Sequence, residues 1–450
     1  MALMRLFFGS FLQAALLQRN IPFSSTALHF DYMKRQTSPP PKIALALSGG
    51  GPLGAIYEIG ALCALQESLN GIDFTQLQHY VGVSAGGFIA AGLANGITPR
   101  ELCNSFIENN SDELSEAVDP SWLLSPAYGE FALRASLMPG LFASALWQLT
   151  TGKKSFIHAM ELMGSGLPTG IFSNEKIDTE MARLFSGPGR TNDFRLLKTQ
   201  LTLVATNLDN GETAPFGRPG WDHIPISKAV QASSALPGLF PPVEIEGNYY
   251  VDGALKKTMH ASVALDEGID LLLCVNPLVP FDATAPKVTD GTQDDRPPET
   301  HPIPRIVDGG LPAVLSQTFR AMIHSRMVLG MTQYAHTYPH TDIILIEPDQ
   351  RDPELYLANT FSYAQSRYMA EHAYQQTRRL LRSRKTGLSA KLWRHGITLH
   401  HEALDDPKRR LIAPIQYPTR VGQAISRLHM VMNDLGHIVR SEAHKESTTW

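Results

Sequence analysis

The sequence predicts an α/β fold with a mainly parallel central sheet and helices on both faces of it. The first half of the chain alternates short apolar runs with longer helical segments: Ile43–Leu47 precedes Tyr57–Ser68, and Tyr80–Val83 precedes Gly86–Ala94. Further apolar runs of strand length follow later in the chain. They are Leu201–Asn207, Leu271–Asn276 and Thr341–Ile346.

A glycine-rich turn follows the first predicted strand. Its sequence is Gly49-Gly50-Gly51-Pro52-Leu53-Gly54, and a helical run begins directly after it. Such a turn can point successive backbone N–H groups at an anion. The spacing of Gly49, Gly51 and Gly54 also fits a dinucleotide-binding loop. The acid at about the right distance for that reading, Asp73, follows Gly71-Ile72 and does not close a second strand, which favours the simpler anion cradle.

A second glycine-flanked turn, Gly82-Val83-Ser84-Ala85-Gly86, follows the next predicted strand. Glycines on both sides of a serine permit the tight strand-to-helix bend that exposes a nucleophilic hydroxyl. Because the two turns follow strands of one parallel sheet, we expect both to face the same crevice. A nucleophile elbow beside an N–H cradle is the minimum equipment for acyl transfer through an oxyanion.

A third motif, Asp252-Gly253-Ala254, follows the run Ala232-Ser233-Ser234-Ala235-Leu236-Pro237-Gly238-Leu239-Phe240-Pro241-Pro242-Val243. The three motifs in this order resemble the patatin-like phospholipase family, over about residues 42–280. The resemblance implies a three-layer sandwich. It also implies a lipid acyl hydrolase that forms an acyl-enzyme and needs neither calcium nor a cofactor.

The resemblance assigns a serine–aspartate dyad, with Ser84 as nucleophile and Asp252 as base. The oxyanion hole would come from the backbone at Gly49, Gly50, Gly51 and Gly54. Gly82 and Gly86 would shape the elbow, and Gly253 and Ala254 the turn at the proton acceptor. An aspartate has an ordinary pKa near about 3.9, so this role requires partial burial.

The sequence contains one competing motif and one departure from the family pattern. Asp308-Gly309-Gly310 is a closer literal match to the family's D-G-G motif than Asp252-Gly253-Ala254, but it lies in a proline-rich stretch without a preceding strand. We therefore expect Asp252 to be the base. Leu53 stands where the family usually has Arg or Lys, which removes a cation but no backbone donor.

Composition limits the function classes. The 450-residue chain is 43% apolar and has a net charge of −4, which argues against nonspecific nucleic-acid binding. Its three cysteines, Cys63, Cys103 and Cys274, form no disulfide framework. Cys63 and Cys274 lie in apolar runs, and we expect these two to be buried. The sixteen histidines show no metal-binding spacing, so no metal site is expected.

The chain is expected to divide into four parts. Residues 1–40 form an unstructured or targeting-like extension, and residues 41–280 form the catalytic domain. Within that domain a helical insertion spans about residues 100–195, and its apolar centre, Phe131–Leu167, is either a lipid-facing lid or ordinary core. Residues 281–305 form a flexible insertion. Residues 306–450 form a helical and β extension packed on the catalytic domain.

Several alternatives stay open at this stage. A neutral-lipid or general carboxylesterase would use the same residues on a different substrate, and a non-catalytic lipid-binding protein could keep the scaffold. The basic end of Phe361–Lys385 is either a solvated helix terminus or a contact with anionic lipid. No apolar run reaches the roughly 20 residues needed to span a bilayer. We expect a cytoplasmic or peripheral membrane protein, with a targeting role of residues 1–30 as the alternative.

Overall fold

A computed structural model describes residues 40–108, 125–150, 164, 166–282, 305–352, 354–355 and 363–412. The expectations for residues 1–39, for most of 281–305 and for the region after 412 lie outside these residues. So does the part of the apolar insertion between 151 and 163. The chain divides into two compact units, Met1–Pro41 and Lys42–Trp450, and every helix and strand described below belongs to the second.

The second unit is built on one mixed sheet with the strand order β6-β7-β4-β3-β1-β8-β9, while β5 pairs with β4. The strands are β1 (Ile43–Leu47), β3 (His79–Val83), β4 (Gln200–Asn207), β5 (Thr213–Phe216), β6 (Val243–Ile245), β7 (Asn248–Asp252), β8 (Leu271–Val275) and β9 (Asp342–Ile346). A small second sheet pairs β2 (Leu69–Asn70) with β10 (Thr398–Leu399).

The five neighbouring strands β4, β3, β1, β8 and β9 of the large sheet run parallel. In the described part of this sheet, the antiparallel pairs are β4 with β5, β4 with β7, and β6 with β7. The direction in which the chain adds parallel strands to the sheet reverses at β1. Strand β3 lies on one side of β1, and β8 lies on the other side. In open α/β sheets, ligands bind at the carboxyl ends of the strands beside such a reversal. The turn after β1 and the turn after β3 are the glycine loop and the serine elbow.

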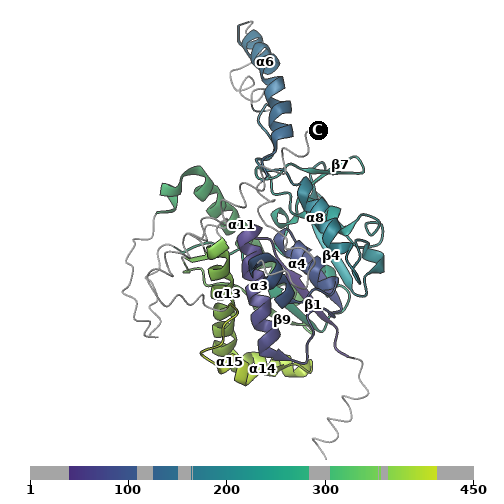
Figure 1. The fold of residues 1–450 in the computed structure, drawn as a ribbon, viewed down its shortest axis with the longest axis vertical. Helices are drawn as coiled ribbons and strands as arrows, with labels where there is room; N and C mark the ends of the chain where they lie inside the picture. Colours follow the sequence, from purple (N-terminus) through teal and green to yellow (C-terminus); the bar gives the residue numbers. More distant parts are fainter. Residues whose placement is uncertain are drawn as a thin grey trace, which may run out of the picture. The chain divides into compact units, whose positions relative to one another are not determined.

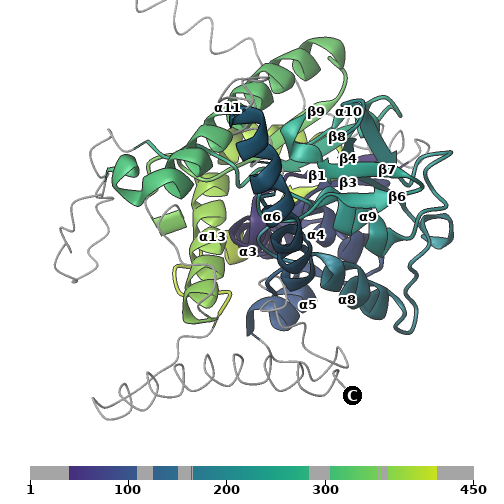
Figure 2. The same ribbon diagram turned by 90° about the horizontal axis from the view of Figure 1, so that it is seen from above.

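Helices cover both faces of the sheet, which gives three layers and confirms the predicted fold class (Figures 1 and 2). Alternate side chains of β1 pack on opposite faces of the sheet. Leu45 and Leu47 belong to the core between the sheet and α3, whereas Ala44 and Ala46 belong to the core on the other face. The α-helices among the described residues are α3 (Gly51–Ser68), α4 (Ala85–Ala94), α5 (Pro99–Cys103), α6 (Tyr128–Thr150), α8 (Glu175–Phe185), α9 (Ile226–Ser233), α10 (Ser262–Leu265), α11 (Gly310–Thr337), α13 (Tyr363–Ser383), α14 (Lys385–Arg394) and α15 (His401–Asp405).

The region after residue 306 is part of the same unit as the catalytic motifs. Strand β9 extends the parallel sheet beside β8, and α13 lies along α3 (Figure 1). The basic end of α13 serves this packing, because Arg378 is 1% exposed and donates hydrogen bonds to the carbonyls of Ala403, Leu404 and Asp406. Arg378 is therefore a structural cation, so the lipid-contact alternative is wrong for this residue.

The described half of the apolar insertion is helix α6, and its large side chains are not core. The exposed fractions are 60% for Leu133, 62% for Phe142 and 68% for Trp147. The core alternative is therefore wrong for these three residues. The lid interpretation stays a prediction.

The three cysteines are free and buried, which confirms the expected burial of Cys63 and Cys274. Within the described ranges, no helix combines the length and the apolar character required to cross a membrane.

Candidate active site

Strand register brings Ser84 and Asp252 to the same level of the sheet. Strand β4 runs past the end of β3: Val83 pairs with Val204, while Ala205 to Asn207 continue beyond it. Strand β7 pairs with this overhang in the opposite direction, so that Asp252 lies opposite Ala205. Ser84, the residue after Val83, is at the level of Ala205 on the other side. The two predicted catalytic residues therefore meet across β4.

Ser84 has the backbone of a nucleophile elbow. Its φ of 54° and ψ of −126° are rare for a residue with a side chain, and α4 begins at the next residue. The buried Ser233 holds this conformation: its hydroxyl accepts the Ser84 N–H at 2.9 Å and donates to the carbonyl of Val204 at 2.6 Å. Ser233 belongs to the run that preceded the third motif in the sequence, but nothing in that pattern indicated this contact.

The Asp252 carboxylate is 2% exposed, and its Oδ1 accepts a hydrogen bond from the Ala254 N–H at 2.8 Å. The Ser84 side chain is close enough to lower the pKa of this carboxyl group. Burial raises the pKa of Asp252 to about 6, although the Ser84 side chain and the Ala254 N–H oppose the shift. A carboxyl group with this pKa is ionised at neutral pH and is a better base than an exposed aspartate.

Contacts with Val204 and His260 hold the turn after Asp252 in place. A Cβ atom at Gly253 would lie 2.3 Å from the Val204 carbonyl oxygen, so only glycine fits there. The Gly253 carbonyl oxygen lies 3.2 Å from Nε2 of the buried His260, which is the donor in the neutral ring. Burial is the main cause that lowers the pKa of His260 to about 4, so the ring is neutral at physiological pH. Motif analysis missed His260, although its position eight residues after Asp252 is visible in the sequence.

The glycine loop lies against the nucleophile. A Cβ atom at Gly49 would stand 3.0 Å from the Ser84 Cβ and 3.5 Å from its Oγ. Gly50 caps α3 and Gly51, at a φ of 60°, begins it. The first N–H groups of a helix have no acceptor within the helix, so those of this loop are available to an anion.

Gly54 corrects one detail of the predicted oxyanion hole. Its N–H donates to the carbonyl of Gly50 at 3.0 Å, so it is already used inside the structure. A Cβ atom at Gly50 would lie 2.6 Å from the Gly54 Cα, which shows how tightly the two residues pack. Gly54 thus shapes the loop, and the candidate donors narrow to Gly49, Gly50 and Gly51.

Gly82 and Gly86 allow the elbow to pack against its neighbours. A Cβ atom at Gly82 would lie 2.5 Å from the Gly87 Cα, and one at Gly86 would lie 2.5 Å from the Ser48 carbonyl oxygen. The Gly86 N–H also donates to that oxygen at 3.2 Å. This bond ties the serine elbow to the residue before the glycine loop.

Gly86→Ala is expected to destabilise the fold by several kcal/mol, because the new methyl group would collide with backbone that cannot move away. Gly87→Ala is the matched control: its Cβ would meet Leu203 Cδ2 at an ordinary 3.5 Å, and alanine favours the helix. Thermal unfolding of both variants measures the difference. Equal melting temperatures would contradict the close approach at Gly86.

The two competing acids are exposed, unlike Asp252. Asp308 is exposed in a short 3-10 helix, Ile306–Gly309, directly before α11. Asp73 accepts hydrogen bonds from Thr75 and Gln76 in an exposed turn. Leu53 is a partly buried residue of α3 that packs against the core.

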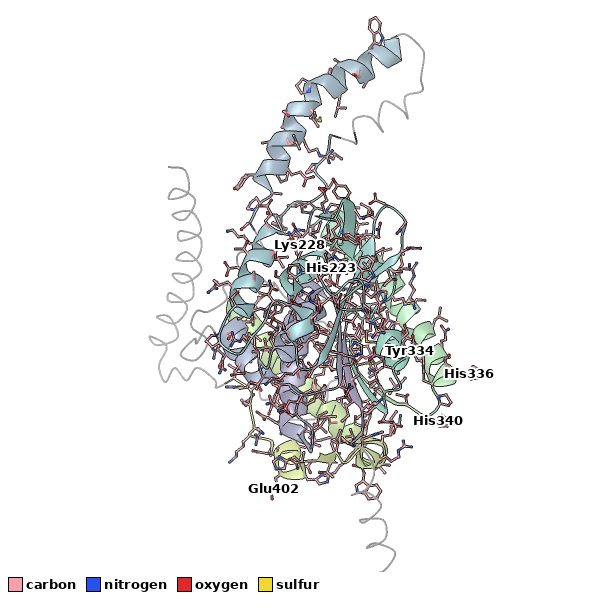
Figure 3. The ribbon with its side chains drawn as sticks, turned by 90° about the vertical axis from the view of Figure 1, so that its right-hand side faces the viewer. His223, Lys228, Tyr334, His336, His340 and Glu402 are labelled. Atoms are coloured by element: carbon pink, nitrogen blue, oxygen red, sulfur yellow. The ribbon has the colours of Figure 1, made fainter. Side chains whose placement is uncertain are left out.

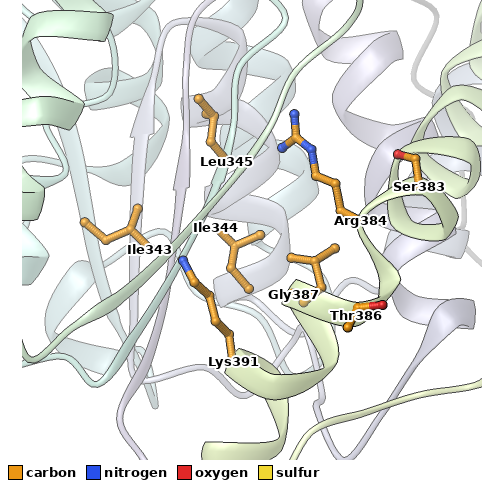
Figure 4. A pocket seen from close by; sticks show the side chains of 9 residues that line it. Ile343, Ile344, Leu345, Ser383, Arg384, Thr386, Gly387 and Lys391 are labelled. Carbon is orange, nitrogen blue, oxygen red and sulfur yellow. The ribbon is translucent and has the colours of Figure 1, made fainter. Parts of the chain in front are cut away.

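A separate pocket of about 420 Å³ lies between β9 and α14 (Figure 4). Its lining includes the cations Arg384 and Lys391 and the hydroxyls of Ser383 and Thr386. It contains no carboxylate and no residue of the Ser84 site, so the serine–aspartate arrangement is the better candidate for chemistry.

No group of three or more His, Cys, Asp or Glu side chains in the described part of the chain could hold a metal ion. His223, for example, lies apart from His336 and His340 (Figure 3).

Comparison with known proteins agrees with the sequence motifs. The family model of the patatin-like phospholipases matches residues 45–265. Uncharacterized protein R571 of Acanthamoeba polyphaga mimivirus is 26% identical over 245 residues, which cover 52% of this chain and 67% of that protein. Uncharacterized protein YqhO of Bacillus subtilis is 28% identical over 206 residues, which cover 44% of this chain and 57% of that protein. The matched stretch thus spans about two thirds and just over half of these relatives.

Among solved structures, VipD from Legionella pneumophila is similar at 18% identity and a TM-score of 0.34, with 77% of this chain and 67% of that chain covered. The type III effector protein ExoU is similar at 16% identity and a TM-score of 0.31, with 80% and 55% covered. These two structural similarities are distant, and the match of residues 45–265 to the family model does not depend on them.

Proposed function

Residues 45–265 form a patatin-like phospholipase domain, and we propose that this domain hydrolyses ester bonds of phospholipids or related lipids through an acyl-enzyme on Ser84. The observation that carries the proposal is the position of Ser84 and the buried Asp252 carboxylate at one level of the sheet, on either side of β4, with the Gly49 backbone against the Ser84 hydroxyl. Nucleophile, base and oxyanion donors are then within reach of one carbonyl carbon.

In the first half of the reaction, Asp252 accepts the Ser84 proton while Oγ attacks the ester carbonyl carbon. The carbonyl oxygen becomes an oxyanion, which the N–H groups of the glycine loop stabilise. When the tetrahedral intermediate collapses, the C–O bond to the alcohol breaks. The leaving alcohol takes the proton from Asp252, and the acyl group stays on Ser84.

In the second half, Asp252 takes a proton from water, which attacks the acyl-enzyme. The second tetrahedral intermediate collapses to release the fatty acid, and the proton returns from Asp252 to the Ser84 oxygen. The raised pKa of Asp252 suits both steps, because this side chain must gain and lose a proton in each cycle.

The exposed apolar side chains of α6 support a lipid substrate. Phe142 and Trp147 can contact long acyl chains, which a small polar ester lacks. The substrate class is tested by following fatty-acid release from phospholipid vesicles, a neutral-lipid emulsion and a short soluble ester. Faster turnover of the neutral lipid than of the phospholipid would favour the carboxylesterase alternative.

The activity is expected to fall on the acid side of pH 6. The pKa of Asp252 is raised to about 6, and a protonated carboxyl cannot accept the Ser84 proton, so kcat/KM should drop about tenfold per pH unit below that value. The measurement is a pH profile with the soluble ester. The control is His260→Asn, which should keep the same acid limb because burial holds the pKa of His260 at about 4. Loss of the limb in this variant would assign it to the histidine instead.

A further inference from the structure

Ser48 lies between the glycine loop and the serine elbow, and its backbone is bonded to the scaffold on both sides. It follows β1, directly precedes Gly49 and is fully buried. Its N–H donates to the Val275 carbonyl at the end of β8 at 3.2 Å, and its carbonyl accepts the Gly86 N–H at 3.2 Å. The sheet and the elbow therefore hold the backbone of Ser48 in one place.

The Ser48 hydroxyl has a fixed contact of its own, with the side chain of Asn276. Ser48 Oγ donates to Asn276 Oδ1 at 2.9 Å, and Asn276 is also fully buried. The same Oδ1 accepts the Leu278 N–H at 3.1 Å. Because a backbone N–H can only donate, this second contact identifies the amide atom as the oxygen, so the Ser48 hydroxyl must be the donor. The fold thus determines where this hydroxyl points.

The same hydroxyl also reaches the glycine loop. Ser48 Oγ donates to the carbonyl oxygen of Gly49 at 3.2 Å, so its proton is shared between two acceptors. In a planar trans peptide, the C=O of one residue and the N–H of the next point in opposite directions. With the Gly49 carbonyl directed to the buried Ser48 hydroxyl, the Gly50 N–H is directed away from it. In the described part of the chain this N–H donates to no acceptor, so it is available to an oxyanion.

The peptide between Gly49 and Gly50 needs such a contact from outside the loop. Three consecutive glycines, Gly49 to Gly51, have no Cβ atoms, so the loop itself gives the peptide little preference for one orientation. An oxyanion donor contributes most when it already points at the developing charge before the reaction begins. A contact that fixes the Gly49 carbonyl also fixes the direction of this donor.

We propose that Ser48 is a positioning residue of the oxyanion hole: its hydroxyl, held by Asn276, fixes the peptide between Gly49 and Gly50 so that the Gly50 N–H faces the oxyanion. The inference rests on the proposed function, because the oxyanion is the one that forms when Ser84 attacks an ester. Both Ser48 and Asn276 are 0% exposed and cannot touch the substrate. Their effect therefore falls on the transition state and not on substrate binding.

The test uses the full chain and a short soluble ester. Ser48→Ala should lower kcat about tenfold or more, because a misdirected N–H stabilises the oxyanion poorly, and should leave KM within about twofold. An alkyl trifluoromethyl ketone forms an adduct with the Ser84 hydroxyl that carries the same oxyanion. The affinity for this ketone should weaken by the same factor as kcat.

Asn276→Ala tests whether the two side chains act as one unit. It should lower kcat by a smaller factor than Ser48→Ala, again with little change in KM. The double variant should lose no more kcat than Ser48→Ala alone, since both changes act through one hydroxyl. A further loss in the double variant would contradict the role given to Asn276.

The matched control is Ser227→Ala, which removes another buried serine hydroxyl that is paired with an asparagine. Ser227 is 1% exposed, and its Oγ accepts from Asn192 Nδ2 at 3.0 Å. It lies at the opposite end of α9 from Ser233. This variant should keep the kcat and the ketone affinity of the parent, and thermal unfolding of both variants separates a loss of stability from a loss of kcat.

Unchanged kcat and ketone affinity in Ser48→Ala would overturn the proposal. An equal loss in Ser227→Ala would also overturn it, because the effect would then follow from stability. A raised KM at constant kcat would place Ser48 in substrate binding and would contradict the proposed role. A parent chain that neither hydrolyses the ester nor binds the ketone would refute the proposed function itself, and this inference with it.

Discussion

Ser84→Ala is expected to abolish ester hydrolysis and covalent labelling by a fluorophosphonate probe. The hydroxyl is the atom that would form the acyl-enzyme, and the loss of a catalytic nucleophile lowers kcat by roughly 10⁴-fold or more. The fold should persist, because the Ser84 N–H keeps its bond to Ser233 and Asp252 keeps its bond from the Ala254 N–H. The measurements are probe labelling, turnover of the soluble ester and thermal unfolding.

The matched control is Ser234→Ala, which removes the hydroxyl next to Ser233. Ser234 is half-buried, and its N–H bonds to carbonyls of its own helix, so both labelling and turnover should stay near the parent values. Probe labelling that survives in Ser84→Ala would identify another nucleophile and would remove the basis of the proposed mechanism.

The sequence predicted the parallel core of the sheet closely. Residues Ile43–Leu47 form β1 as expected, and the other predicted strands differ from the observed ones by one residue at an end. Strands β1, β3, β4 and β8 are buried on both faces, so continuous apolar runs mark them clearly. The antiparallel strands β5, β6 and β7 are shorter or partly exposed, so no long apolar run marks them in the sequence.

The motif residues were predictable because each is fixed by local backbone geometry. Ser84 requires its strained elbow, and Gly86 and Gly253 leave no room for a Cβ atom. By contrast, Ser233 supports Ser84 from 149 positions away. No local pattern reveals such a contact, since it depends on how α9 packs beside β4.

The C-terminal region also contains contacts that no local sequence pattern reveals. Arg378 lies in a basic run that resembles a solvated helix end, yet the carbonyls of Ala403, Leu404 and Asp406 surround its guanidinium. A buried cation paired with several carbonyls cannot be told from an exposed one by sequence alone.

Asp252→Asn is expected to remove the activity while it raises the stability of the fold. The amide can still accept the Ala254 N–H, which Asp252 Oδ1 accepts at 2.8 Å, but it cannot take the Ser84 proton. Turnover of the soluble ester should fall by several orders of magnitude. Asp308→Asn, an exposed change on the competing D-G-G motif, is the matched control and should be near neutral in both properties.

The stability change has a defined dependence on pH. The pKa of Asp252 is raised from 3.8 to about 6 on folding, so between these values the folded state binds the extra proton and stability falls as pH rises. Above pH 6 the buried charge costs the fold on the order of 3 kcal/mol. The Asn variant should therefore melt higher than the parent at pH 7 to 8, and this advantage should vanish towards pH 4. An inactive Asn variant that is less stable at every pH would instead point to a structural role, and full activity in Asp252→Asn with loss in Asp308→Asn would reassign the base.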